Sequence, residues 1–278
     1  SAIRIVVCDG RPSLKPQGSL SPLQTESLLK DTFLRAVMAG PTFGLIGGSG
    51  LREPSILTGG KERPIDTPYG RTSDAPVVGR HGRATVIFLA RHGKDHRIPP
   101  HRLNHRANLW ALKELGATRI LSTASTGSLK KTIRPGSFVV PHDFVSFWDI
   151  PTFHDDDVHH ATPSIDDELR ELLITATKSA RGSVRARGVY VQTSGPRLET
   201  RAEIAHFATL GDVVGMTMAS EATLASELGI PYACLCTVDN FCNGIVERPL
   251  TYEQIAAMQA RTEELVRKVI AGALEAVG

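Results

Sequence analysis

The chain has 278 residues, 41% of them hydrophobic and 22% charged, which is typical of a globular protein with one large α/β domain or two small ones. A net charge of +3, from 32 basic and 29 acidic residues, gives no global field for nucleic acid or an anionic membrane surface. Because the apolar runs are short and broken by Gly, Pro or charge, we expect no membrane span and no signal peptide, and hence a cytoplasmic protein.

The first 40 residues differ from the rest of the chain. Residues 3–22 are rich in turn-forming residues, and residues 23–38 carry apolar side chains at helical spacing. We interpret residues 1–40 as an N-terminal extension without an assigned role, and residues 41–278 as a single domain.

From residue 43 onward, short β-rich runs alternate with helical patterns. Strands are expected at residues 43–48, 84–90, 119–125, 136–145, 188–195, 212–218 and 232–241. Helices are expected at residues 103–116, 166–180, 200–211, 220–229 and 251–277. This alternation predicts a mostly parallel sheet covered by helices.

The first of these strands ends in an unusual sequence, FGLIGGSGL, at residues 43–51. Glycines let backbone N–H groups approach an anion closely, and Ser49 adds a hydroxyl donor. A phosphate site and a plain tight turn both fit this stretch. It matches neither the GxGxxG dinucleotide fingerprint nor the GK[ST] of a P-loop.

Three further strand ends carry polar residues where ligands of such sheets bind. Arg91 and His92 follow residues 84–90, residues 122–128 are rich in hydroxyls, and Met216 and Thr217 follow a fourth apolar run. Together with Ser49 they supply the cations and hydroxyls that bind a phosphate dianion without a metal. We therefore predict an anion site at this edge of the sheet.

The cysteines and acidic residues give little support to a metal site. Cys8, Cys234, Cys236 and Cys242 have neither CxxC spacing nor companion histidines, and buried free thiols are the expected state. The acidic run at residues 155–157 is expected in an exposed loop rather than in a calcium cluster.

Six motifs follow one another along the chain: GLIGGSGL, DTPYGRTSDAP, LARHGKDHRIPPHRLNHRANLWALKELGATRI, IRPGSFVVPHDFV, SGPRLETRAE and GMTMASEATLASELGIPYACLCTVDN. In sequence and order they resemble those of a known family, the trimeric purine nucleoside phosphorylases, and especially their methylthioadenosine phosphorylase branch. The resemblance implies the nucleoside phosphorylase fold, an α/β fold with a twisted, mixed, mostly parallel sheet flanked by helices. It also implies a pentosyltransferase without cofactor or metal, in which inorganic phosphate attacks ribose C1′ and the purine leaves, assembled as a homotrimer or a dimer of trimers.

The resemblance assigns residues to each part of the substrate. For phosphate it implies Ser49, Arg91, His92, Thr217 and the backbone of Ser125. For the nucleoside it implies Met216 beneath the ribose, and Leu198, Glu199, Asp239, Asn240 and Leu250 around the base and sugar, with Asp239 as the catalytic residue that assists departure of the purine. Ala124 stands where the methylthioadenosine enzymes tend to have a threonine, so Thr123 or Ser125 has to supply the hydroxyl.

The identity of the purine depends on two acidic residues. Glu199 is a hydrogen-bond acceptor when ionised, which suits the N1–H of a 6-oxopurine and matches the glutamate of the 6-oxopurine phosphorylases. Alternatively, Glu199 caps a helix or pairs with Arg197 or Arg201. Asp239 matches the aspartate that binds adenine, and Asn240 follows it. We expect a preference for 6-oxopurine nucleosides or their 5′-methylthio forms, with S-methyl-5′-thioadenosine phosphorolysis as the alternative.

The sugar's 5′ end is expected under the last helix. Leu250, Tyr252 and Ile255 lie near its start, and Thr251 and Gln254 have the spacing of a capping box. The segment has no histidine, which favours a methylthio group, although His159 or His160 from a loop can also reach a nucleoside, including that of a neighbouring subunit. Two other classes stay open, a nucleoside hydrolase and a non-catalytic module that binds phosphate or nucleosides.

Overall fold

The computed structural model describes residues 6–8, 11–13, 40–147, 150–247 and 249–277. The chain divides into two units, Ser1–Gly40 and Pro41–Gly278. In the first unit, β1 (Val6–Cys8) pairs antiparallel with β2 (Arg11–Ser13). The helical pattern predicted for residues 23–38 lies outside the described residues.

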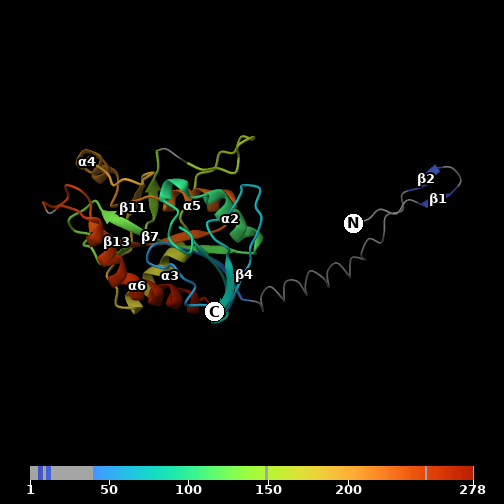
Figure 1. Ribbon diagram of the computed structural model, residues 1–278, viewed down its shortest axis with the longest axis horizontal. Coiled ribbons are helices and arrows are strands. Elements are labelled where there is room, and N and C mark those ends of the chain that lie inside the picture. Colours follow the sequence, from blue (N-terminus) through green and yellow to red (C-terminus); the bar gives the residue numbers. More distant parts are fainter. Residues whose placement is uncertain (1–5, 9–10, 14–39, 148–149, 248, 278) are drawn as a thin grey trace. The chain divides into compact units, whose positions relative to one another are not determined.

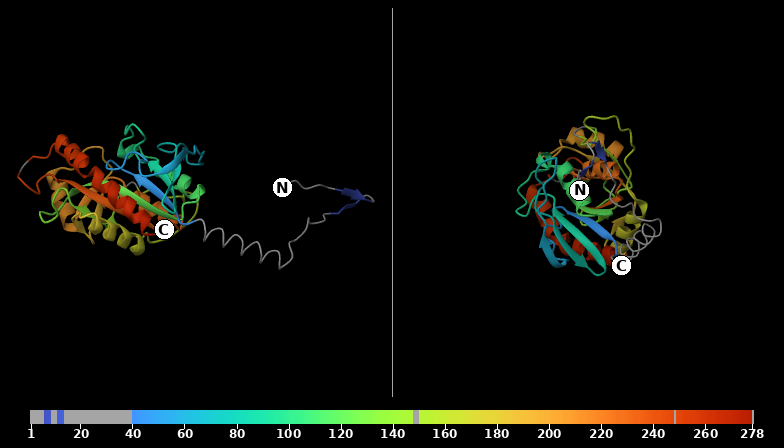
Figure 2. Two further views of the ribbon diagram at one scale, coloured as in Figure 1. Left: turned by 90° about the horizontal axis from the view of Figure 1, so that it is seen from below. Right: turned by 90° about the vertical axis from the view of Figure 1, so that its right-hand side faces the viewer.

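The second unit is built on an 11-stranded mixed sheet. At its centre β3 (Thr42–Gly47) lies between β6 (Ala84–Ala90) and β7 (Arg119–Ser128), and β13 (Tyr232–Phe241) lies on the other side of β7, with all three pairs parallel. These strands are largely buried, as parallel strands covered on both faces are. The right-hand view of Figure 2 shows the blue and cyan strands of this region side by side.

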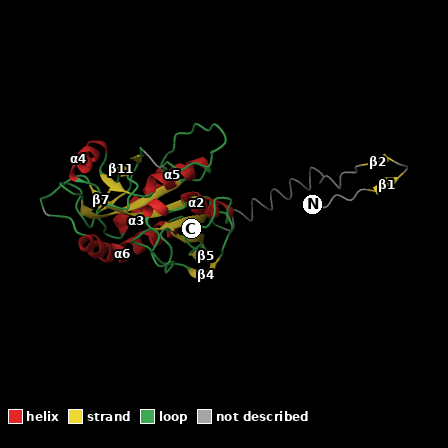
Figure 3. Ribbon diagram, turned by 45° about the horizontal axis from the view of Figure 1, so that its top comes forward, coloured by secondary structure: helices red, strands yellow, loops and turns green. Residues whose placement is uncertain are grey.

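Shorter strands extend this centre in both directions. At one edge β5 (Val77–His81) and β4 (Thr58–Glu62) continue the sheet antiparallel (Figure 3), and at the other β8 (Phe138–Val139) and β10 (Val184–Arg185) follow β13. β12 (Val213–Gly215) pairs with β7 and carries β11 (Val189–Gln192), which pairs in turn with β9 (Asp143–Val145). The mixed, mostly parallel sheet predicted from the sequence is confirmed.

Helices cover both faces of the sheet (Figure 1). α2 (His105–Glu114) and α5 (Met218–Glu227) pack together on one side, and α3 (Asp167–Ser179) and α6 (Tyr252–Glu275) pack together on the other. α4 (Arg201–Leu210) follows β11, and a short 3-10 turn, η1 (Pro100–Arg102), precedes α2. Among the described helices, none has the length and apolar character that crossing a membrane requires.

The sequence analysis did not identify β4 and β5. Every residue of β4 is exposed, and its sequence, TGGKE, has no alternation of apolar and polar side chains. It is held by pairing with β5 rather than by a buried face. An edge strand of this kind leaves no periodic signal in the sequence.

One irregularity in the sheet bears on the site. β13 pairs with β7 in register up to Val238, and the register then shifts so that Asn240 pairs with Gly127. Asp239 is therefore the extra residue of a β-bulge, a feature that re-aims side chains.

Candidate active site

A cavity of about 400 Å³ opens at the carboxyl ends of β3, β6 and β7, which is a volume suited to a small-molecule ligand. It contains the residues assigned to phosphate, sugar and base except Asp239; the alternatives Thr123, His159 and His160 do not line it. The predicted residues that line it are Ser49, Arg91, His92, Ser125, Leu198, Glu199, Met216, Thr217, Asn240 and Leu250.

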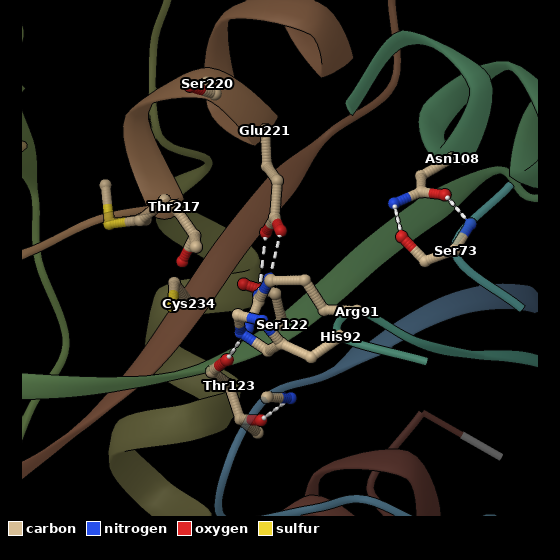
Figure 4. A network of polar contacts seen from close by, with 12 residues as sticks. Ser73, Arg91, His92, Asn108, Ser122, Thr123, Thr217, Ser220, Glu221 and Cys234 are labelled. Carbon is tan, nitrogen blue, oxygen red and sulfur yellow. Dashed lines mark hydrogen bonds and ion pairs between the residues drawn. The ribbon is translucent and has the colours of Figure 1, made fainter. Parts of the chain in front are cut away.

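Arg91 is the centre of the end of this cavity predicted to bind phosphate, here called the phosphate end, and only 1% of its surface is exposed. Its Nε and Nη2 donate to the two carboxylate oxygens of Glu221, the second at 3.0 Å, and its Nη1 donates to the Thr123 carbonyl at 2.7 Å (Figure 4). Burial alone lowers the pKa of Arg91, but the charge and hydrogen bonds of Glu221 outweigh it and hold that pKa above its ordinary value. Because a guanidinium has five N–H donors, Arg91 keeps two for a ligand.

A polar network fixes Glu221 in turn. The Tyr232 hydroxyl donates to Glu221 Oε2 at 2.8 Å, and Ser122 Oγ lies 2.6 Å from the same hydroxyl. All of these groups are buried. A buried charge is tolerated only when it is paired and hydrogen-bonded, so this network holds the cation of Arg91 in place.

Gly48 explains part of the glycine-rich strand end. A Cβ on Gly48 would lie 2.5 Å from Arg91 Nη1 and 2.5 Å from the Thr123 carbonyl oxygen, so a side chain here would displace the guanidinium. The Gly48 N–H donates to the Thr123 hydroxyl at 2.9 Å. Of the two hydroxyls proposed to replace the missing threonine at position 124, Thr123 is therefore bonded to the glycine loop, and Ser125 lines the cavity.

Two histidines lie beside Arg91. The ring of His92 has its Nδ1 2.8 Å from the Ile98 carbonyl, which assigns the proton to Nδ1 and leaves Nε2 for other contacts. Burial and the charge of Arg91 lower the pKa of His92 to about 4. His96, which the sequence analysis did not select, has its ring centroid 4.6 Å from that of His92 and its Nε2 3.5 Å from Ser49 Oγ.

The start of α5 presents Thr217 to the cavity. Tyr190 Oη accepts from the Thr217 and Met218 N–H groups at 3.2 and 3.4 Å, and Gln192 Oε1 accepts from Ala219 N–H at 2.7 Å. Because these side chains satisfy the first N–H groups of the helix, the Thr217 hydroxyl makes no capping bond. That hydroxyl is available to a bound anion.

Met216 precedes Thr217 and packs against the loop after β11. Gly195 in that loop has φ +68°, and a Cβ there would lie 2.5 Å from the Met216 sulfur. The glycine of the SGPRLE motif therefore lets the loop close over Met216.

Glu199, in the same loop, is buried at the end of the cavity predicted to bind the purine, here called the base end. Thr193 Oγ1 donates to its Oε1 at 2.7 Å. Glu203, rather than Glu199, pairs with Arg197 and caps the following helix. Arg197 bonds both oxygens of Glu203 at 2.8 and 2.7 Å, and Glu203 forms the capping box of α4 with Thr200. Within the described part of the chain, Glu199 has no cationic partner.

Asn240 and Asp239 lie differently, although they are neighbours in the sequence. Asn240 lines the cavity with Glu199, and its Nδ2 donates to the Phe241 carbonyl at 3.0 Å. Asp239 is 2% exposed and lines a neighbouring cavity instead. A direct contact between Asp239 and the base stays a prediction.

Asp239 reaches the main cavity through Ser125. The Ser125 hydroxyl donates to Asp239 Oδ2, and Gln259 Nε2 donates to Ser125 Oγ at 3.0 Å. Asp239 Oδ1 is buried without a partner among the described groups. Burial raises the pKa of Asp239 to about 6. Gln259, from α6, lines the cavity and was not predicted from the sequence.

The start of α6 covers the side of the cavity predicted for the sugar's 5′ end. Leu250, Tyr252 and Ile255 all line the cavity, and Tyr252 is 72% exposed. Thr251 Oγ1 accepts from Gln254 N–H, so the predicted cap is present. His159 and His160 are exposed in a loop, where His159 stacks on His154.

Two residues of the acidic run in that loop contact basic side chains. Asp155 bonds Arg106, and Asp157 lies 3.0 Å from His154. Within the described residues, no group of three or more His, Cys, Asp or Glu side chains is arranged to hold a metal ion.

The chain belongs to the phosphorylase superfamily, whose family model matches residues 42–275. It is 43% identical over 235 residues to a protein of Archaeoglobus fulgidus named "Probable 6-oxopurine nucleoside phosphorylase", covering 81% of this chain and 96% of that one. It is 42% identical over 232 residues to the "Probable S-methyl-5'-thioinosine phosphorylase" of Methanocaldococcus jannaschii, covering 82% and 89%.

Among solved structures, the methylthioadenosine phosphorylase of Schistosoma mansoni in complex with adenine is similar to this chain. The TM-score is 0.78, the sequence identity 31%, and the match covers 86% of this chain and 92% of that one. The family resemblance and the nucleoside phosphorylase fold predicted from the sequence are confirmed.

Proposed function

We propose that this enzyme catalyses the phosphorolysis of 6-oxopurine nucleosides and of their 5′-methylthio forms. The observation that carries the choice of purine is Glu199, a buried acceptor that has no cationic partner among the described residues and lies in the same cavity as Arg91. An ionised carboxylate accepts from the N1–H of hypoxanthine or guanine, whereas it faces a lone pair on N1 of adenine. The relatives named for 6-oxopurine and methylthioinosine substrates support this choice.

The reaction follows from the two ends of the cavity. Phosphate bound by Arg91, Ser49 and Thr217 attacks C1′, the new C1′–O bond forms as the C1′–N9 bond breaks, and the electron pair of that bond passes to the purine. Negative charge then develops on the base. A donor positioned where that charge appears stabilises the transition state, and the amide of Asn240 is the side chain in the cavity suited to bond N7 or O6.

S-Methyl-5′-thioadenosine is the second candidate substrate. The apolar side chains of Leu250 and Ile255 at the start of α6 favour a methylthio group on either purine. The similar Schistosoma mansoni structure is described as a methylthioadenosine phosphorylase with adenine bound.

The assembly belongs to the proposal as well. Phe147, Ile150 and Val158 are large apolar side chains that are more than half exposed, and His159 follows them in the same loop region. We expect a homotrimer, or a dimer of trimers, to cover this surface and bring His159 or His160 toward a neighbour's nucleoside. Light scattering that gave a monomer at micromolar concentration would contradict this assembly.

A phosphate-dependence assay tests the activity. Inosine, methylthioinosine, adenosine and methylthioadenosine are each incubated with and without phosphate, and the free base and the sugar 1-phosphate (ribose 1-phosphate or its 5-methylthio form) are measured. We expect turnover only with phosphate, and faster with the two inosine nucleosides. Turnover without phosphate would indicate a hydrolase, and binding without turnover a non-catalytic module. Faster turnover of both adenine nucleosides would overturn the choice of purine.

A further inference from the structure

The hydroxyl of Ser125 has two partners from different parts of the fold. It donates from β7 to Asp239 Oδ2 on β13, and it accepts from Gln259 Nε2 on α6 at 3.0 Å. Ser125 lines the cavity with Arg91 and Thr217, whereas Asp239 does not line it. A buried carboxylate is therefore connected to the phosphate end of the cavity through one hydroxyl group.

The hydrogen bonds between Asp239, Ser125 and Gln259 have two possible arrangements, which differ in the protonation of Asp239. A serine hydroxyl carries one proton and can accept two hydrogen bonds. When Asp239 is ionised, it accepts a hydrogen bond from the Ser125 hydroxyl. The single proton of Ser125 is then used, and Ser125 offers the cavity only a hydrogen-bond acceptor. When Asp239 is protonated, it can donate to Ser125 Oγ and Gln259 can occupy the second acceptor position, which frees the Ser125 proton to point into the cavity.

We propose that Asp239 is a positioning residue that turns Ser125 into a donor for the bound phosphate when Asp239 holds a proton, and that Gln259 keeps Ser125 in place for both arrangements. Binding of the dianion at the phosphate end is then accompanied by uptake of a proton at Asp239. This inference rests on the proposed function, because it takes the ligand at Ser125 to be the phosphate co-substrate.

The surroundings of Asp239 support such a role. Burial raises the pKa of Asp239 to about 6, so a modest preference of the dianion for the protonated form is sufficient to move its titration across neutral pH. In the protonated arrangement the proton lies on Oδ2, the oxygen that contacts Ser125 Oγ, while Oδ1 has no hydrogen-bond partner among the described groups. A nearby dianion disfavours a second negative charge, which acts in the same direction.

Other charged and titratable groups face this region from each neighbouring element. Arg261 of α6 lines the same neighbouring cavity as Asp239, and Arg91 lies at the phosphate end. Cys236 of β13 stays a thiol, because burial raises its pKa well above the ordinary value. His92, whose pKa is lowered to about 4, titrates below the range of the test, which leaves His96 as the neighbouring histidine whose titration can imitate the effect.

Sulfate is the probe that isolates Asp239, because it stays a dianion where phosphate itself titrates. Its dissociation constant is measured by calorimetry from about pH 5 to about pH 8 for the wild type and for Asp239→Asn. We expect the wild type to lose about tenfold more affinity across this range than the variant, the size of one charge-assisted hydrogen bond. Asn at position 239 can donate to Ser125 at every pH, so its sulfate affinity keeps only the histidine contribution.

Two further variants keep the test decisive. Ser125→Ala should bind sulfate weakly and with the shallow pH dependence of Asp239→Asn, because the hydroxyl that transmits the effect is gone. Gln259→Met should weaken sulfate binding by about threefold while retaining the wild-type pH dependence. Equal pH dependence in the wild type, Asp239→Asn and Ser125→Ala would overturn the inference.

The sulfate measurement also separates this inference from the proposed function. It needs no turnover, so an enzyme that binds sulfate with a flat pH profile contradicts only the role of Asp239. Failure of sulfate and phosphate to bind at all contradicts the phosphate end of the proposed function.

Discussion

The two ends of the cavity are built in different ways. At the phosphate end, Arg91 is held by Glu221 and by the Thr123 carbonyl, and its partners are held by further buried groups. At the base end, Glu199 has one neutral donor and lies in a loop, and Asn240 follows a bulge. The phosphate end is thus a cross-linked part of the sheet, whereas the base end can change residue by residue. We infer that the type of reaction depends on the first and the choice of purine on the second.

The largest effect is expected when the ion pair at the phosphate end is broken. Glu221→Ala leaves the Arg91 cation buried and unpaired, which should lower the free energy of unfolding by about 3–5 kcal/mol. Tyr232→Phe is the matched control, because it keeps the ion pair and removes only the hydroxyl that bonds Glu221 and Ser122, which should cost about 1–2 kcal/mol. Urea unfolding of both variants measures the difference. Equal costs would mean that the ion pair does not hold this end together.

Asp239 belongs to neither end, and its effect should depend on pH. Its pKa is raised from 3.8 to about 6 in the folded chain, so between these values the folded state holds a proton that the unfolded state has lost. The free energy of unfolding of the wild type therefore falls, relative to Asp239→Asn, by about 3 kcal/mol as pH rises through this window, and stays at that difference above it. Denaturant unfolding of both proteins on either side of the window checks the sign, and a constant difference contradicts the raised pKa.

Glu199→Gln sharpens the comparison at the base end. An amide can still bond the base but no longer offers a charged acceptor to N1–H, so kcat/KM for inosine should fall by roughly 10- to 100-fold, or about 1.5–3 kcal/mol. The KM for phosphate should stay unchanged, and adenosine should lose less. A comparable rise in the KM for phosphate would show that the two ends are not independent.

Thr217→Val is the corresponding change at the phosphate end. Its hydroxyl makes no capping bond, so the variant keeps the helix and loses one donor to phosphate. We expect the KM for phosphate to rise about fivefold, or about 1 kcal/mol, while the preference between inosine and adenosine stays the same. Steady-state kinetics with both nucleosides tests this, and a changed preference argues against the separation.

The smallest effect is expected at the sugar's 5′ end. The apolar side chains of Leu250 and Ile255 should favour methylthioinosine over inosine by roughly fourfold in kcat/KM, the value of about one buried methylene. Leu250→Ser should reduce that ratio. A ratio at or below one in the wild type would indicate a pocket built for ordinary ribonucleosides.

The sequence predicted that the residues of the phosphate end lie together, because parallel strands end at one edge of a sheet. Ser49, Arg91 and Ser125 each follow or end an apolar run, and this is enough to bring them together. The partner of Arg91 could not be predicted in the same way. Glu221 is 130 positions away in the first turn of a helix, and nothing in its local sequence indicates which charge it meets.

The base end depends on a β-bulge, which cannot be recognised from the apolar and polar pattern of the sequence. A bulge adds one residue to a strand, so the order of Asp239 and Asn240 in the sequence does not tell which of them lines the cavity. The position of Gln259, by contrast, could have been predicted from helical periodicity. Ile255, Thr262 and Val266 are buried on one face of α6, and Gln259 lies at helical spacing between them, which marks it as a polar side chain on an inward face.

The cysteines of the large unit offer a way to measure the predicted changes in stability without an added fluorescent label. Cys234, Cys236 and Cys242 are free and buried, as the sequence predicted. Cys242 lines the main cavity, whereas a thiol reagent can reach Cys234 and Cys236 only when the surrounding strands open. The rate at which these two thiols are labelled then reports the free energy of opening under native conditions. With Cys8 and Cys242 replaced by Ser, the protein carries its own reporter in β13, the strand that bears Asp239.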